Sequence, residues 1–195
     1  MTQKPMLLRT LAILFFGLCP LPLLSQEAKP QNAISKELEE LFKADQAERD
    51  DAFLDQTPEK MGALIMRDAR RRERVVQIVT KEVLSSAEDY HHAAMVLQHG
   101  DKPEEFLMAH ELATVAAFKG HKQGPWLSAS ALDRFLQSIG RPQRFGTQFS
   151  RKDEAPWTQE PYDRSMNDSI RKEYGAHTLA EQAKHLEEMN SKKEH

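Results

Sequence analysis

The sequence has one cysteine and eight glycines, and it lacks the common motifs of hydrolases and nucleotide-binding proteins. So few glycines argue against a loop-rich β protein. There is no Gly-x-Ser-x-Gly elbow, no glycine-rich phosphate loop and no His-Glu-x-x-His pair. These gaps remove the usual signatures of an activity. We therefore expect no cofactor and no metal, and the sequence does not decide whether the protein is an enzyme.

Excess positive charge is also missing. The 27 lysines and arginines stand against 30 acidic residues, which gives a formal charge of −3. Loss of residues 1–25 would remove Lys4 and Arg9 but no acid, leaving 25 basic and 30 acidic residues and a charge of −5. A protein with this balance is not expected to bind nucleic acid.

Residues 1–25 have the pattern of a secretory signal peptide. Lys4 and Arg9 precede an apolar run over residues 11–18, and Ser25 supplies a small residue at the expected cleavage position. The run is too short to span a bilayer comfortably. We expect cleavage near Ser25, export to the periplasm or beyond, and no membrane span in the mature chain; the alternative is an anchor formed by an uncleaved N-terminus. Cleavage would also remove Cys19, so the mature protein would contain no thiol and no disulfide.

The rest of the chain favours an all-α, single-domain fold of about five to seven helices in antiparallel hairpins. Apolar residues recur at helical spacing, and the local geometry is typical of Sel1-like or tetratricopeptide-like helix pairs. We predict a flexible lead over residues 26–33, a helical domain over 34–190 and a frayed tail over 191–195. Five long helices should precede a long ordered loop, and two shorter ones should follow it.

Several residues predict where these helices begin and end. Ser86 with Asp89, and Thr178 with Glu181, have the spacing of capping boxes. Thr57 followed by proline predicts another helix start, and either Asp163 or Asn167 should cap the short sixth helix. Gly100, Gly120, Gly140 and Gly175 are placed to end helices. The arginine-rich stretch 67–74 is predicted to be a solvated helix face, although Asp68 and Arg72 could form a partly buried pair.

The stretch 140–149, here called the central loop, holds the candidate site. Its sequence, Gly-Arg-Pro-Gln-Arg-Phe-Gly-Thr-Gln-Phe, combines polar side chains with two glycines where the helical periodicity stops. Functional residues are often carried by loops on a rigid scaffold. Together with polar residues of the preceding helices, the candidate ligand-binding set is His99, Asp133, Arg134, Gln143, Phe145, Gly146, Thr147 and Gln148.

Three of these elements together resemble an uncharacterised bacterial family, a domain of unknown function. They are Gln98-His99, Asp133-Arg134 and the stretch Gly140 to Gln148, which matches a "QH … DR … GxxQxYGTQ" pattern with Phe145 in the place of tyrosine. The resemblance extends roughly over residues 40–186. It implies a small, mainly helical domain and no known activity.

Three functions are compatible with this set of residues. In the first, the protein is a binding or interaction module whose polar pocket at the central loop takes a small polar ligand or a protein partner. In the second, His99 acts with Asp133 or Arg134 in a small hydrolase-like enzyme. In the third, the polar side chains only satisfy the backbone of the loop in a structural envelope protein. Asp133 and Arg134 are adjacent and point about 100° apart on a helix, so both cannot face one pocket squarely.

Overall fold

The structure, a computed structural model, describes residues 30–52 and 57–191. Within these ranges the chain forms seven helices and one small antiparallel sheet. The helices are α1 (Gln31–Ala52), α2 (Pro58–Lys81), α3 (Ala87–Leu97), α4 (Pro103–Phe118), α5 (Gly124–Ser138), α6 (Asp168–Glu173) and α7 (Leu179–Ser191), and the strands are β1 (Phe149–Ser150) and β2 (Thr158–Gln159). The predicted signal peptide, residues 26–29 of the lead and residues 192–195 of the tail lie outside the described residues.

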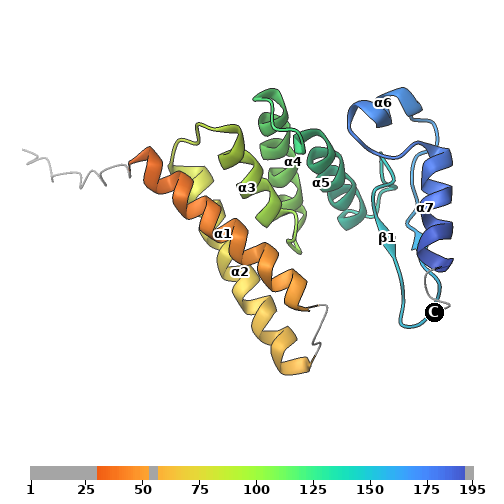
Figure 1. Ribbon diagram of the computed structural model, residues 1–195, viewed down its shortest axis with the longest axis horizontal. Helices are drawn as coiled ribbons and strands as arrows, with labels where there is room; N and C mark the ends of the chain where they lie inside the picture. The colour runs from red at the N-terminus through yellow and green to blue at the C-terminus, as the bar shows by residue number, and fades with distance from the viewer. Residues whose placement is uncertain (1–29, 53–56, 192–195) are drawn as a thin grey trace, which may run out of the picture.

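The elements follow one another along an elongated molecule (Figure 1). The long antiparallel pair α1–α2 lies at one end, the hairpins α3–α4–α5 in the middle, and the β hairpin with α6 and α7 at the other end. The predicted all-α fold is therefore confirmed. None of the described helices is long and apolar enough to cross a membrane.

Helix α1 begins earlier than the sequence pattern predicted. The amides of Ala33 and Ile34 donate to the carbonyl of Pro30, so the helix starts at Gln31. The predicted flexible lead is wrong for residues 31–33. The reason lies in packing, because Ile34 is 1% exposed in the core and the preceding turn is ordered with it.

Helix starts agree with most of the predicted caps. Ser86 and Asp89 form a reciprocal capping box, and Thr178 does the same with Glu181. Asn167, rather than Asp163, caps α6 by accepting from the amide of Ser169. Thr57 stands at the N-cap position of α2 but its side chain makes no capping bond, so this start depends on Pro58.

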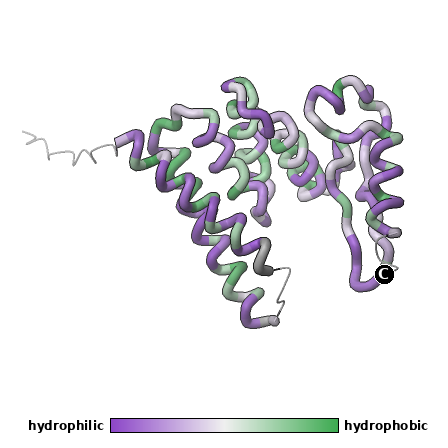
Figure 2. The backbone as a smooth tube through the Cα atoms, viewed as in Figure 1, coloured by the Kyte–Doolittle hydropathy of each residue, from purple (hydrophilic) through white to green (hydrophobic). Residues whose placement is uncertain are grey.

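The core is built where alanines let helices approach closely. Ala93, Ala94, Ala113 and Ala116 are all 0% exposed between α3, α4 and α5. Gly124 allows α5 to approach α4 closely, since a Cβ at this position would lie 2.6 Å from the backbone nitrogen of Ala117. Figure 2 shows hydrophobic residues concentrated in these central helices, while most of α7 is hydrophilic.

The arginine-rich stretch of α2 is not simply a solvated face. Arg71 and Arg72 are 8% and 6% exposed, and Asp68 is also buried. Arg71 binds Asp68 and Glu48, whereas Arg72 binds Glu105 across the helix interface instead of pairing with Asp68. The sequence interpretation was wrong here because the acids that pair with these arginines lie on other helices or one turn away.

A histidine cluster lies near the N-terminal end of α3. The ring of His91 stacks on that of His121 with centroids 3.8 Å apart, and His91 is 3% exposed. Its Nε2 is buried without a hydrogen-bond partner. Burial, and then the proximity of His121 and His92, lowers the pKa of His91 to about 4.

We expect this histidine to make the fold sensitive to acid. The folded-state pKa lies below the ordinary value of 6.5, so between pH 6.5 and 4 the unfolded chain binds the proton more readily. Stability is therefore complete above pH 6.5 and falls with pH through this window, by about 2 kcal/mol at pH 5 from His91 alone. Urea unfolding at pH 7 and pH 5 measures the loss. His91→Phe should reduce it by that amount, and His177→Gln, an exposed control, should leave it unchanged.

Candidate functional site

Asp133 is the centre of the contacts that hold the central loop. It lies on α5 and is 0% exposed. Its Oδ1 accepts from the amides of Arg144 (2.6 Å) and Phe145 (2.9 Å), and its Oδ2 accepts from the amide (2.9 Å) and hydroxyl (2.8 Å) of Thr147. Both carboxylate oxygens are thus used in binding one turn of loop backbone.

Gln143 and Gln148 complete this arrangement. The Gln143 side chain is buried, accepts from the Gln148 amide at 2.7 Å, and donates to the carbonyls of Gln148 and Glu160. The Gln148 side chain donates to the hydroxyls of Ser130 and Thr147. We call the contacts made by Asp133, Gln143, Thr147 and Gln148 the loop clasp.

The remaining loop residues are fixed from the C-terminal side. Phe145 is 3% exposed and packs on Tyr174, with ring centroids 4.6 Å apart. Its carbonyl accepts from the guanidinium of Arg171, which is 0% exposed, and from Gln182 at 2.7 Å. Gly146 has a φ of +77°, a conformation that favours glycine, and the Gln182 side chain lies close to it.

The structure therefore divides the predicted site residues into two groups. Asp133, Gln143, Phe145, Gly146, Thr147 and Gln148 come together, but they bind one another, the loop backbone and neighbouring helices. Arg134 lies on another side of α5, and it is near His99, which follows the C-terminal end of α3. The predicted pairing of His99 with Asp133 is wrong, because Asp133 directs its oxygens to the loop.

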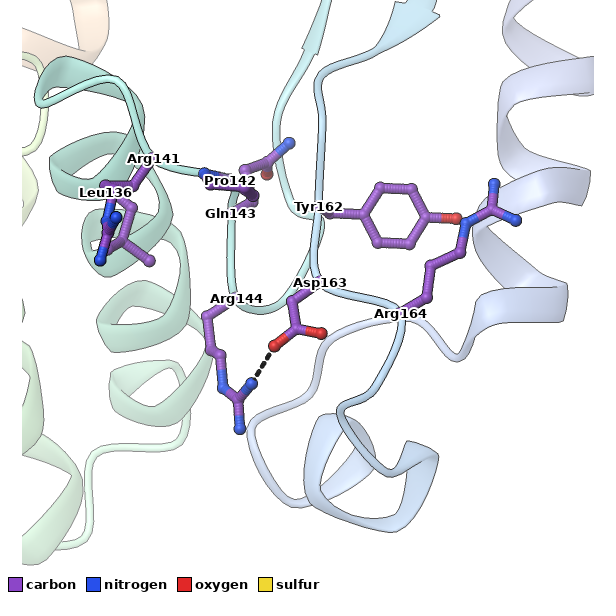
Figure 3. Close-up of a pocket in the computed structure, with 8 residues that line it drawn as sticks. All are labelled: Leu136, Arg141, Pro142, Gln143, Arg144, Tyr162, Asp163 and Arg164. Carbon is purple, nitrogen blue, oxygen red and sulfur yellow. Dashed lines mark hydrogen bonds and ion pairs between the residues drawn. The ribbon is translucent and has the colours of Figure 1, made fainter.

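A pocket does lie at the central loop, on its outer side (Figure 3). It has a volume of about 540 Å³. Its lining consists of Leu136, Arg141, Pro142, Gln143, Arg144, Tyr162, Asp163 and Arg164. Gln143 of the loop clasp is part of this lining, and its backbone exchanges hydrogen bonds with Pro161 (2.9 Å) and Asp163 (2.8 Å).

The charge in this loop pocket is mainly positive. Arg144 forms an ion pair with Asp163, visible as the dashed line in Figure 3. Arg164 lies over the ring of Tyr162, with 5.4 Å between the guanidinium carbon and the ring centroid. Arg141 is exposed, and its side chain makes no hydrogen bond or ion pair with the described residues. The lining thus carries three arginines and one carboxylate, with Arg144 directed at Asp163, Arg141 beside Leu136 and Arg164 beside Tyr162.

His99 and Arg134 belong to a second polar group, here called the His99 cluster, which consists of Asp45, Arg49, Gln98, His99 and Arg134. His99 Nδ1 lies 2.9 Å from Asp45 Oδ2 and 2.7 Å from Arg49 Nε, and its Nε2 lies 2.7 Å from Gln98 Nε2. Burial lowers the pKa of His99, outweighing the opposite effect of Asp45, so the ring is neutral at pH 7. A neutral ring carries one N–H: with the proton on Nε2, Nδ1 accepts from Arg49 Nε, and with the proton on Nδ1, this nitrogen donates to Asp45 while Nε2 accepts from Gln98.

Asp45 and Arg49 were not predicted as site residues. Burial alone would raise the pKa of Asp45, but hydrogen bonds from His99 and Arg49 lower it, so it is ionised. A signal was present in the sequence, since Asp45 continues the buried stripe of Ile34 and Leu38 on the same face of α1. An acid in a core position of an amphipathic helix requires a partner, and here the partners are a histidine and an arginine.

Neither the search for a metal site nor the comparisons with known proteins assign a function to these residues. Among the described residues, no three histidine, cysteine or acidic side chains are placed to hold a metal ion. The resemblance to a bacterial family of unknown function stays a prediction. No protein-family model, no curated protein and no solved structure is detectably similar to this chain.

Proposed function

We propose that the protein is a binding module whose loop pocket takes a small organic anion. The observation that carries this proposal is the excess of guanidinium groups over carboxylates in a pocket of about 540 Å³. Pockets of this size fit a small molecule. Guanidinium groups favour carboxylates and phosphates, which they bind with two parallel hydrogen bonds.

The lining also suggests the shape of the ligand. Arg141 and Arg164 can receive an anionic group, while Leu136, Pro142 and the Tyr162 ring offer apolar surface to the rest of the molecule. We therefore infer an anion with an apolar or aromatic body. The loop clasp supports this function indirectly, because a rigid backbone keeps the arginines in place without a cost on binding.

Phenyl phosphate is a suitable probe of the loop pocket. We expect the purified protein to bind it saturably in a calorimetric titration, and the double variant Arg141→Gln/Arg164→Gln to bind it at least tenfold more weakly, because each charge-assisted bond contributes about 1.5 kcal/mol or more. Both arginines are exposed, so the variant should keep the melting temperature of the parent.

Arg70→Gln is the matched control, since Arg70 is an exposed arginine on α2 and makes no ion pair within the described residues. It should bind phenyl phosphate like the parent protein. Equal binding by the parent and the double variant would contradict the proposal. In that case the loop region would be left with the structural role of holding α6 and α7 on α5.

A further inference from the structure

We propose that Arg134, reinforced by Arg49 beside His99, binds a single oxyanion group, a carboxylate or a phosphate, at a second site distinct from the loop pocket. This site lies where the C-terminal end of α3 meets α1 and α5. The proposal does not depend on the function assigned to the loop pocket, since the two sites share no side chain.

The carrying observation is a partly buried cation without a counter-ion. The guanidinium of Arg134 makes no hydrogen bond and no ion pair with the part of the chain that the structure describes, and its Nε is buried without a partner. Burial, and then the positive charge of Arg49, lowers its pKa. A partly desolvated guanidinium without a partner is unfavourable for the fold, and a bound anion would offset this cost.

The nearby acids do not compensate this charge, because each already binds another arginine. Asp45 binds Arg49, and Asp68 binds Arg49 and Arg71. Glu48, one turn further along α1 from Asp45, binds Arg67 and Arg71. Among the described residues around the cluster, the carboxylates of Asp45, Asp68 and Glu48 thus form ion pairs with Arg49, Arg67 and Arg71. Arg134 remains as the unmatched charge.

The site is accessible and its parts are fixed. The side chains of His99 and Arg49 are 16% and 27% exposed, so solvent reaches the cluster. Arg49 is held by Asp45 at 2.8 Å and by Asp68 at 3.2 Å, which orients it beside His99. The positive charges of Arg49 and Arg134 both lower the pKa of His99, so both groups lie near its ring. A group bound by Arg134 therefore lies in the field of two guanidinium groups.

The chemistry of these groups specifies an oxyanion. Arg134 offers a planar set of donors, which matches two oxygens of a carboxylate or a phosphate. Gln98 contributes no free donor, since its Nε2 already contacts His99 and its buried Oε1 is an acceptor, so the donors for a ligand come from the guanidinium. The described residues contain no group of acids or histidines suited to a cation here. A negatively charged ligand group fits the local charge.

The test uses inorganic phosphate and acetate as separate probes, with Arg134→Gln as the variant and Arg70→Gln as the matched control. We expect phosphate, acetate or both to bind the parent protein and Arg70→Gln saturably, followed by ³¹P or ¹³C chemical shifts at constant ionic strength. In the Arg141→Gln/Arg164→Gln background, which removes charge from the loop pocket, adding Arg134→Gln should abolish the remaining binding. The two probes show whether the site prefers the phosphate or the carboxylate group.

Melting temperature separates this role from a structural one. In chloride buffer, Arg134→Gln should melt at the same temperature as the parent or about 2–4 °C higher, because an unpaired, partly buried charge has been removed. A structural arginine would show the opposite change. A fall of more than about 5 °C in Arg134→Gln would overturn the proposal, as would probe binding that is unchanged in this variant or absent from the parent.

Two further variants keep the two proposals distinguishable. Arg134→Lys retains the charge but not the planar set of donors, so it should fold and bind either probe at least several-fold more weakly. Arg141→Gln/Arg164→Gln removes charge from the loop pocket alone and should bind phosphate and acetate at the His99 cluster like the parent. Loss of saturable binding in that variant would assign the ion to the loop pocket and overturn the second site.

Discussion

Replacing Asp133 with alanine should lower the melting temperature by roughly 10 °C and release the central loop. The carboxylate is fully buried and accepts four hydrogen bonds, three of them from backbone amides. Without it, these amides are either left unpaired or returned to water together with the loop. We expect a loss of about 3–5 kcal/mol in the free energy of unfolding, because each buried unpaired donor costs about 1–3 kcal/mol.

Asp133→Asn provides the graded comparison. Its single carbonyl oxygen can still accept from two loop groups, but its NH₂ group faces donors, so the loss should lie between those of the parent and the alanine variant. Thermal unfolding followed by circular dichroism measures all three proteins. An alanine variant that melts within about 1 °C of the parent would mean that the carboxylate does not hold the loop.

Gly146→Ala should destabilise the protein more strongly than Gly140→Ala, although both glycines have similar positive φ values, +77° and +71°. A Cβ on Gly146 would lie 2.7 Å from Oε1 of Gln182 and 2.9 Å from Nε2 of Gln159, whereas a Cβ on Gly140 would meet nothing within 4 Å. Both substitutions carry the backbone cost of about 1 kcal/mol for an L residue in this region. Only Gly146→Ala adds a clash.

We expect about 1 kcal/mol of destabilisation for Gly140→Ala and about 3 kcal/mol for Gly146→Ala. The extra loss arises because Gln182 is 1% exposed and is fixed by the carbonyls of Phe145 and His177, so it cannot move aside. Chemical denaturation gives both values directly. Equal losses would show that the Gln182 side chain yields without cost, and that the contact at Gly146 does not contribute to loop attachment.

Local sequence signals were sufficient to predict where most of the helices begin and end. Ser86 with Asp89, and Thr178 with Glu181, form the capping boxes that their spacing predicts, because the partners are three residues apart and need no tertiary information. The helix rotation of about 100° between neighbours also predicted that Asp133 and Arg134 would not share one pocket. Asp133 reaches the loop, and Arg134 lies towards His99.

Contacts between distant parts of the chain could not be predicted in the same way. Arg71 and Arg72 sit in a basic stretch typical of a solvated face, and only the packing of α2 on α1 and α4 places Glu48 and Glu105 beside them. The His99 cluster could not be predicted for the same reason, since Asp45 lies 54 positions before His99 in the sequence. An isolated sequence shows which charges a helix carries, but not which helix comes to face them.

The four hydrogen bonds accepted by Asp133 determine how the chain from the central loop onward attaches to α5. Until the loop arrives, this carboxylate on α5 is hydrated, and it loses that water only by becoming fully buried. Partial docking would remove the water before all four donors are in place, which makes such states unfavourable. The loop should therefore attach and detach as one cooperative unit. The amide protons of Arg144, Phe145 and Thr147 should then exchange with solvent in the same opening event, and α6 and α7 should leave α5 with them.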